Sequence, residues 1–155
     1  MQKLRSYLIF PGLVMIKGVH ITHLDIIDTP GGNVMHAMKK SSLGYSGFGE
    51  AYFSQIHKGA VKAWKRHKKM TLNIIVPFGA IRFILMDGRE ESTNRFQEII
   101  ISKKNYSRLT VPPMIWMGFQ GIDGESILLN IANIEHDPEE VDNMSIDKLK
   151  FNWNN

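Results

Sequence analysis

The stretch "MTLNIIVPFGAIRFILMD", residues 70–87, decides the fold. Apolar side chains alternate along both of its halves, and the polar residues Thr71 and Asn73 lie on the opposite face of the first half. Alternation with a period of two is typical of a β-strand that turns one face to a core. The residues on the predicted inner face are Leu72, Ile74, Val76, Phe78, Ile81, Phe83 and Leu85. Because proline and glycine mark turns, Pro77 and Gly79 predict a turn between two strands.

Further short apolar runs follow the same pattern, and turn residues bound each of them. They read "FQEIIIS", "SRLTVPP", "MIWMGFQG" and "ESILLNIANI". No segment carries a long helical stripe, and only Asp137, as an N-cap before Pro138, predicts one short helix. Many short strands at close spacing are typical of a sandwich or a barrel. We therefore predict one all-β domain over residues 1–155, with an N-terminal arm at 1–43 and a barrel core at 44–153.

The composition limits the classes of protein to which the chain can belong. Hydrophobic residues make up 43% and charged residues 22%, which is typical of a globular chain and not of a disordered one. The sequence has no cysteine, which excludes disulfides, cysteine-ligated zinc and a cysteine nucleophile. The apolar N-terminal run is interrupted at Pro11 and Gly12 and is too short to span a membrane. We expect a cytoplasmic protein with no membrane association.

A second stretch, "HKGAVKAWKRHKKM" at residues 57–70, concentrates the positive charge of the chain. The net charge is +4, and six of the 19 lysines and arginines lie in this stretch. A local basic cluster suits a phosphate group or a polyanion. Proteins that bind single-stranded nucleic acid also use rows of aromatic residues for stacking, and Trp64 is the only aromatic residue here. We therefore expect an anionic small molecule as the partner and no nucleic acid.

The spacing from Gly59 resembles the first of the two motifs of the cupin barrel. That motif reads roughly glycine, five residues and His-x-His, and this chain has Lys65 at the first histidine and His67 at the second. The second cupin motif, Pro-x-Gly followed by two residues and histidine, is similar to "PPMIWM" at 112–117, with Met117 at the histidine. An ammonium group beside one remaining histidine repels a cation. The resemblance implies a cupin-type double-stranded β-helix, or jelly-roll barrel, without a metal or another cofactor.

A larger part of the chain, about residues 44–153, resembles the dTDP-4-dehydrorhamnose 3,5-epimerase family, a metal-free branch of the cupins. The resemblance rests on "KGAVKAWKRH", "FILMD", "NYSRLTVPPMIWMGF" and "LLNIANIEHDPEE". It implies a cofactor-free homodimer in which a histidine removes a proton beside the 4-keto group of a nucleotide-linked deoxysugar. A tyrosine then returns a proton on the other face, and cations hold the enolate and the pyrophosphate. His67 matches the base, whereas the family's tyrosine falls near Leu129 or Ile134, which cannot donate a proton.

The chemistry of these residue types agrees with that role. A neutral imidazole, with a pKa of about 6.5, can accept a proton near pH 7, and nearby lysines favour its neutral form. A lysine also stabilises the negative oxygen of an enolate as it forms, by on the order of 3 kcal/mol for one well-placed donor. Strand alternation puts Lys65 and His67 on one face, and Lys62, Trp64 and Arg66 on the other. Lys65 is therefore predicted to stabilise the enolate beside His67.

The predicted site combines these residues with others on neighbouring strands. The predicted catalytic residues are His67, Lys65 and Tyr52, and Tyr52 could replace the missing acid. The predicted substrate-binding residues are Lys62, Arg66, Asn73, Glu50 and Tyr106, of which Tyr106 is a second candidate for the acid. We predict an epimerase of a nucleotide-linked 4-keto-deoxysugar in the biosynthesis of surface polysaccharides or deoxysugars. Inversion at one carbon, a 3,4-ketoisomerase on the same barrel and a binding module without catalysis stay open as alternatives.

Overall fold

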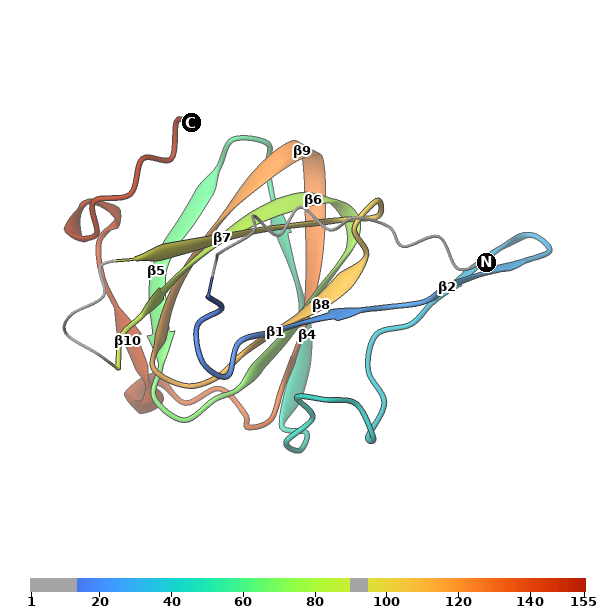
Figure 1. Ribbon diagram of the computed structural model, residues 1–155, viewed down its shortest axis with the longest axis horizontal. Helices are drawn as coiled ribbons and strands as arrows, with labels where there is room; N and C mark the ends of the chain where they lie inside the picture. The colour runs from blue at the N-terminus through green and yellow to red at the C-terminus, as the bar shows by residue number, and fades with distance from the viewer. Residues whose placement is uncertain (1–13, 90–94) are drawn as a thin grey trace.

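The computed structural model describes residues 14–89 and 95–155 and is a barrel built almost wholly from β-strands (Figure 1). The strands are β1 (His20–His23), β2 (Ile26–Thr29), β3 (Gly32–Met35), β4 (Glu50–Ile56), β5 (Val61–His67), β6 (Leu72–Asp87), β7 (Phe96–Ser102), β8 (Ser107–Val111), β9 (Ile115–Ala132) and β10 (Val141–Asn143). The all-β barrel predicted from the alternation is therefore confirmed. The first part of the predicted arm, residues 1–13 with the interrupted apolar run, lies outside the described residues.

The strands pair along two antiparallel paths that share β6 and β9. One path runs β1-β8-β6-β9-β4 and uses the beginning of β6 with the end of β9. The other runs β7-β6-β9-β5-β10 and uses the end of β6 with the beginning of β9. Figure 1 shows both paths curving around a common interior. The two long strands therefore connect the walls of the barrel.

Both long strands bend at the same level of the barrel. The pairing of β6 with β9 shifts between Ile75 and Ile81, and the shift includes Gly79. Gly79 has a φ of 78°, and a Cβ at this position would lie 2.2 Å from Oγ of Ser126 on β9. The turn predicted here is wrong, because the chain bends without reversing and stays within one strand. The turn residues between the apolar runs "MIWMGFQG" and "ESILLNIANI", at 121–126, also lie within one continuous strand, β9. Proline and glycine in a sequence indicate that strand pairing becomes irregular. They do not distinguish a bend within one strand from a turn that reverses the chain.

β6 is buried on both of its faces. All the predicted inner-face residues except Phe78 belong to the main core cluster inside the barrel. Phe78, at the bend, is exposed. On the other face, Ile75 packs in a cluster with Tyr106, and Ile84 packs in a cluster with Trp153 from the C-terminal segment. The C-terminal segment and the chain near β1 therefore cover the outside of the barrel walls.

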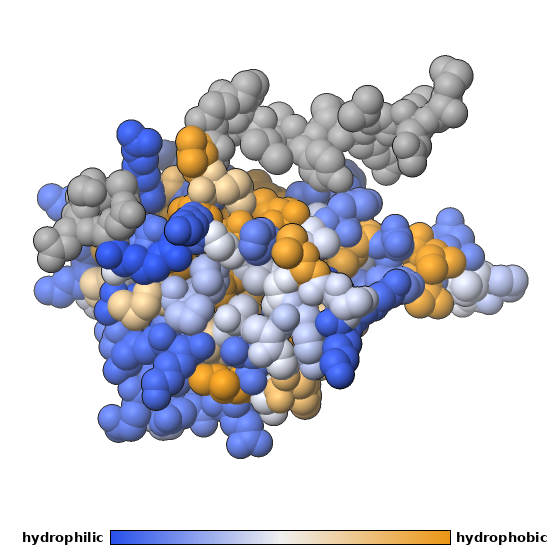
Figure 2. All heavy atoms as spheres, turned by 60° about the horizontal axis from the view of Figure 1, so that its bottom comes forward, coloured by the Kyte–Doolittle hydropathy of each residue, from blue (hydrophilic) through white to orange (hydrophobic). Residues whose placement is uncertain are grey.

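The N-terminal region divides between the barrel and a projection. β1 pairs with β8, so this part of the predicted arm belongs to the barrel sheet. β2 and β3 form a separate hairpin that projects to the right in Figure 1. Figure 2 shows hydrophobic side chains on this projection, and Ile27 and Val34 are exposed there. The hairpin thus offers apolar surface that the barrel does not cover.

The predicted short helix after Asp137 is one turn of 3-10 helix, η1 (Pro138–Glu140). The Asp137 carboxylate accepts a hydrogen bond from the backbone N–H of Glu139 at 2.9 Å, as expected of an N-cap. A second 3-10 turn, η2 (Ile146–Lys148), follows β10. Within the described ranges, no helix is long and apolar enough to cross a membrane.

Candidate active site

A cavity of about 320 Å³ opens in the barrel between β4, β5, β6, β9 and β10. Its apolar lining residues are Ala63, Trp64, Leu72, Ile74, Met117, Phe119 and Leu128. Its polar lining residues are Tyr52, Ser54, Lys62, Lys65, His67, Asn130 and Asn143. No aspartate or glutamate lines the cavity among the residues that the structure describes, so its two lysines make it positive. A cavity of this size with few polar groups is typical of a small-molecule site, and its charge suits an anion.

A bulge in β5 brings both lysines to this cavity. Lys62 pairs with Phe119 and Lys65 pairs with Met117, so three residues of β5 advance while two residues of β9 do. The extra residue resets the alternation, and Lys62 lines the cavity together with Lys65 and His67. The prediction that Lys62 lies on the opposite face from Lys65 is therefore wrong. Lys62, which was predicted to bind the substrate, lies in the same cavity as Lys65 and His67.

The two lysines differ in how they are held. The Lys62 ammonium donates to Oγ of Ser54 at 3.1 Å and to the backbone oxygen of Gln55 at 2.8 Å, and it lies 5.9 Å from the centre of the Phe119 ring. Lys65 is exposed and, among the described residues, makes no ion pair with a carboxylate. The Lys62 ammonium is thus fixed beside β4. The exposed ammonium of Lys65 is available to bind a ligand.

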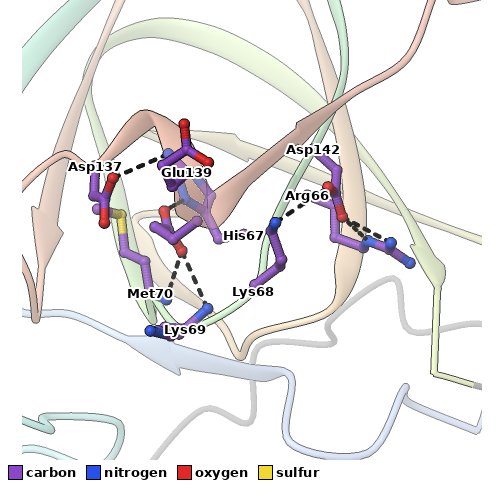
Figure 3. A network of polar contacts seen from close by, with 9 residues as sticks. Arg66, His67, Lys68, Lys69, Met70, Asp137, Glu139 and Asp142 are labelled. Carbon is purple, nitrogen blue, oxygen red and sulfur yellow. Dashed lines mark hydrogen bonds and ion pairs between the residues drawn. The ribbon is translucent and has the colours of Figure 1, made fainter.

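His67 is held by a carboxylate from a distant part of the chain. Its Nδ1 hydrogen-bonds Oε1 of Glu140, which lies in η1. The other carboxylate oxygen, Oε2, accepts hydrogen bonds from the backbone N–H groups of Lys69 at 3.1 Å and Met70 at 3.2 Å (Figure 3). An ionised carboxylate only accepts hydrogen bonds, so Nδ1 carries a proton, and in the neutral ring Nε2 presents a lone pair. The contact with Glu140 therefore fixes the tautomer that a general base needs.

The pKa of Glu140 reflects these contacts. Burial alone would raise the pKa of this carboxyl, since its side chain is only 2% exposed. The hydrogen bonds from His67, Lys69 and Met70 outweigh burial and hold the pKa below its usual value. Glu140 thus stays ionised at neutral pH, which supports the assignment of the proton to Nδ1 of His67.

Tyr52 reaches the same cavity from β4. It stands directly opposite Asn130 of β9 in the strand register. The Nδ2 group of Asn130 donates a hydrogen bond to the Tyr52 hydroxyl at 3.2 Å. The structure therefore brings together the predicted catalytic residues, His67, Lys65 and Tyr52, in one cavity.

Arg66 does not reach the cavity. Its guanidinium donates to Oδ2 of Asp142 at 2.7 Å and 3.1 Å and lies 4.7 Å from the centre of the Trp116 ring. Figure 3 shows Arg66 and Lys68 directed toward Asp142, on the side of β5 away from His67. Its predicted role as a substrate-binding residue has no support from this geometry, because the guanidinium is paired with Asp142 on the outside of the barrel.

Three other predicted binding residues also lie away from the cavity. Asn73 is buried between β6 and β8, where it bonds the backbone oxygen of Gly44 and the Thr110 hydroxyl. Tyr106 is buried outside the barrel wall, donates to the backbone oxygen of His36, and has its pKa raised by burial. Glu50 begins β4 and is not among the residues that line the cavity. The hydrogen bonds of Asn73 and Tyr106 thus connect parts of the fold and lie away from the cavity.

Glu140 and Asn130 contact predicted catalytic residues but were not themselves predicted from the sequence. Glu140 lies 73 residues after His67, and the acidic segment that holds it reads as an ordinary helix start. Asn130 lies in the apolar segment "ILLNIA" of β9. A single amide in an apolar strand was the only feature of the sequence that could have indicated it. Among the described residues, no group of three or more histidine, aspartate or glutamate side chains is placed to bind a metal ion.

Known proteins resemble both the sequence and this barrel. Residues 17–147 match the family described as FdtA: WxcM-like, C-terminal. The solved structure of a dTDP sugar isomerase from Desulfovibrio desulfuricans is 35% identical, with a TM-score of 0.84 over 89% of this chain and 92% of that one. The family match and this relative cover most of the chain.

Two further likenesses are more distant. A probable low-salt glycan biosynthesis epimerase of Haloferax volcanii is 30% identical over 96 residues, and the match spans 59% of this chain and only 62% of that protein. A dTDP-6-deoxy-D-glucose-3,5-epimerase from Legionella pneumophila, solved with dTDP-4-keto-L-rhamnose, is 16% identical. It shares the fold with a TM-score of 0.78 over 91% of this chain and 81% of that one.

These likenesses agree with the barrel and confirm the distant resemblance to the 3,5-epimerases. The chain belongs to the family described as FdtA: WxcM-like, C-terminal, within the cupin sugar-nucleotide isomerases and epimerases.

Proposed function

We propose that the protein is an epimerase of a nucleotide-linked 4-keto-deoxysugar and that His67 is its general base. The observation that carries this proposal is the contact of His67 with the buried carboxylate of Glu140 at the wall of a cavity lined by two lysines. A base, a group that orients it and a positive site for an oxyanion are what proton abstraction beside a carbonyl requires.

The first step is the removal of a proton from the carbon next to the 4-keto group. Nε2 of His67 takes this proton, and the electron pair of the C–H bond moves to give an enolate on the sugar. The imidazolium that forms is stabilised by the ionised Glu140 on its other nitrogen. The ring stays in place during the transfer because Glu140 is itself held by two backbone N–H groups.

The lysines serve the negative charges of the substrate. Lys65 stabilises the enolate oxygen, as predicted from its position two residues before His67. Lys62, held between Ser54 and the backbone of Gln55, serves the pyrophosphate end of the nucleotide sugar. The apolar residues Leu72, Ile74 and Leu128 exclude water from the sugar and strengthen these charge interactions.

The second step returns a proton to the same carbon on the other face. Tyr52 donates its hydroxyl proton, and the enolate collapses to the ketone. The phenolate then regains a proton from solvent, and the His67 imidazolium releases its proton to solvent, which restores both groups. Tyr52 lines the cavity together with His67 and comes from a different strand, which suits two-sided chemistry. The names of the relatives, a dTDP sugar isomerase and a glycan biosynthesis epimerase, support a role in making deoxysugars for surface polysaccharides.

Deuterium uptake tests the proposal. The protein is incubated in D₂O with a dTDP-linked 4-keto-6-deoxyhexose, and the sugar is followed by proton NMR and mass spectrometry. We expect loss of the proton signal at a carbon next to the keto group, together with the signals of the inverted sugar. Absence of exchange with several nucleotide sugars that nonetheless bind would leave a binding module and sink the enzymatic proposal.

The same NMR spectra separate the second candidate. A 3,4-ketoisomerase begins with the same proton abstraction and ends with the carbonyl on the neighbouring carbon. The candidate is kept because the family's tyrosine position has no acid in this chain, whether it is Leu129 or Ile134. In the carbon NMR spectrum of the product, a ketone at C3 in place of C4 would identify the ketoisomerase.

A further inference from the structure

Asn130 stands at the centre of one wall of the cavity. In the register of β9 it is flanked by Tyr52 of β4 on one side and by Ile74 of β6 on the other. Its side chain is buried, with 1% of the residue exposed. Leu128 and Ala132, the neighbours of Asn130 on the same face of β9, are apolar and buried. Asn130 is therefore a polar residue between two apolar neighbours on this face of β9.

The stability of the fold does not explain this amide. Among the described residues, its Nδ2 group bonds the Tyr52 hydroxyl at 3.2 Å, and its Oδ1 atom is buried without a hydrogen-bond partner. A buried polar atom without a partner is unfavourable, whereas an apolar side chain of similar shape avoids this cost. Within the part of the chain that the structure describes, the one hydrogen bond of the Asn130 side chain goes to Tyr52.

The direction of that hydrogen bond has a chemical consequence. A tyrosine hydroxyl has one hydrogen to donate and also accepts hydrogen bonds. Because Asn130 donates to the Tyr52 oxygen, the hydroxyl keeps its own hydrogen available for another acceptor. The cavity supplies no carboxylate to take it among the described residues, and Tyr52 is partly open to the cavity.

We infer that Asn130 is a positioning residue that aims the Tyr52 hydroxyl hydrogen at the enolate carbon. This inference rests on the proposed function and deepens it. His67 takes the first proton and later releases it to solvent, and Tyr52 gives the second. The phenolate left on Tyr52 accepts the hydrogen bond from Nδ2 of Asn130 until solvent reprotonates it. Asn130 therefore governs inversion and not proton abstraction.

Measuring exchange and inversion in the same sample tests this inference. The probe is the dTDP-linked 4-keto-6-deoxyhexose in D₂O, and the variant is Asn130→Leu, which removes the amide and keeps the shape. We expect kcat for inversion to fall by at least about tenfold, since misplacing a catalytic group is costly, with KM within about twofold. Exchange through His67 continues, so the ratio of inversion to exchange falls.

Two further variants sharpen the assignment. In Tyr52→Phe the same ratio falls, and adding Asn130→Leu to it has no further effect, because both changes remove one function. In Asn130→Asp, a protonated carboxyl can donate to Tyr52 and an ionised one cannot, so the ratio of inversion to exchange recovers as the pH is lowered. The matched control is Asn154→Leu, which removes an exposed amide outside the cavity and leaves the ratio unchanged.

The outcomes separate the inference from the function on which it rests. A wild-type ratio of inversion to exchange in Asn130→Leu, in a sample whose thermal unfolding shows a folded protein, overturns the inference alone. An Asn130→Asp variant whose ratio of inversion to exchange follows the wild-type pH profile overturns it too. A wild-type protein that exchanges no proton of the probe overturns the proposed function and this inference together.

Discussion

The contact between His67 and Glu140 connects residues that the sequence holds far apart. His67 was predicted from its place in a cupin motif, because a histidine at fixed spacing is a local pattern. Glu140 was not predictable in the same way, since its partner lies 73 residues earlier and no spacing rule joins them. Lys65 and Tyr52 lie in the same cavity as His67. Arg66 lies outside the barrel, where it contacts Asp142 and Trp116, and the sequence does not reveal these partners.

Replacement of His67 by glutamine is expected to abolish proton abstraction. The amide has a similar size but cannot accept a proton near neutral pH, so exchange of the sugar proton should fall by about 10²–10⁴-fold. The measurement is deuterium uptake in D₂O. The control is His57→Gln, because His57 contacts Glu125 on the surface and does not line the cavity. Wild-type exchange in His67→Gln would remove this residue from the mechanism.

Replacement of Glu140 by glutamine tests the orientation of the base. An amide can donate to Nδ1 and thereby move the ring proton to Nε2, where it blocks proton abstraction. We expect kcat to fall by more than about tenfold with a smaller change in KM, as for other carboxylates that orient a catalytic histidine. A steady-state assay of the Glu140→Gln variant checks this, and an unchanged kcat would contradict it. The control is Glu139→Gln, whose side chain is exposed in the same turn.

At the scale of elements, the sequence predicted the strands but not their continuity. The inner-face alternation of β6 is correct from Leu72 to Leu85, with the exception of Phe78. The turns predicted at Gly79 and at residues 121–126 are bends, because each long strand has a partner on both sides of the bend and continues along it. The bulge in β5 was also invisible in the sequence, since it is defined by the register with β9.

Gly79→Ala is expected to destabilise the bend of β6. Its φ of 78° and a Cβ position 2.2 Å from Oγ of Ser126 and 2.7 Å from the backbone oxygen of Glu125 both oppose a side chain. The free energy of unfolding should fall by about 1–3 kcal/mol, as measured by urea denaturation. Gly124→Ala is the matched control, because Gly124 has a φ of 55° with nothing within 4 Å of a Cβ. Equal losses in the two variants would show that the contact with Ser126 is unimportant.

At the scale of the whole molecule, Glu140 links stability to pH. In the folded protein its pKa lies below the ordinary value of 4.5, so between those values the folded state binds fewer protons than the unfolded state. The stability that this group contributes is fully present above about pH 4.5 and is lost as the pH falls through the folded pKa. We expect wild-type unfolding free energy to decline more steeply on acidification than that of Glu140→Gln, as followed by denaturant titrations from pH 7 to pH 3.

The homodimer expected from the sequence stays a prediction at this scale. Phe53 on β4 is 69% exposed, and Ile27 and Val34 on the projecting hairpin are also exposed (Figure 2). Exposed apolar side chains on a wall and a projection are typical of an interface. Light scattering coupled to size-exclusion chromatography should give about twice the 17.7 kDa of one chain, and Phe53→Ser should lower that mass. A mass equal to one chain would contradict the expected dimer.

The position of η1 has a consequence for synthesis of the protein on the ribosome. All the lining residues of the cavity except Asn143 have been made once β9 is complete, but Glu140 comes after β9 in the chain. Until that turn leaves the ribosome and docks, His67 has no carboxylate to fix its tautomer. On the proposed mechanism, a chain that stops before η1 could bind a sugar without rearranging it. On that mechanism, His67 is therefore oriented for catalysis only after most of the cavity wall has been synthesised.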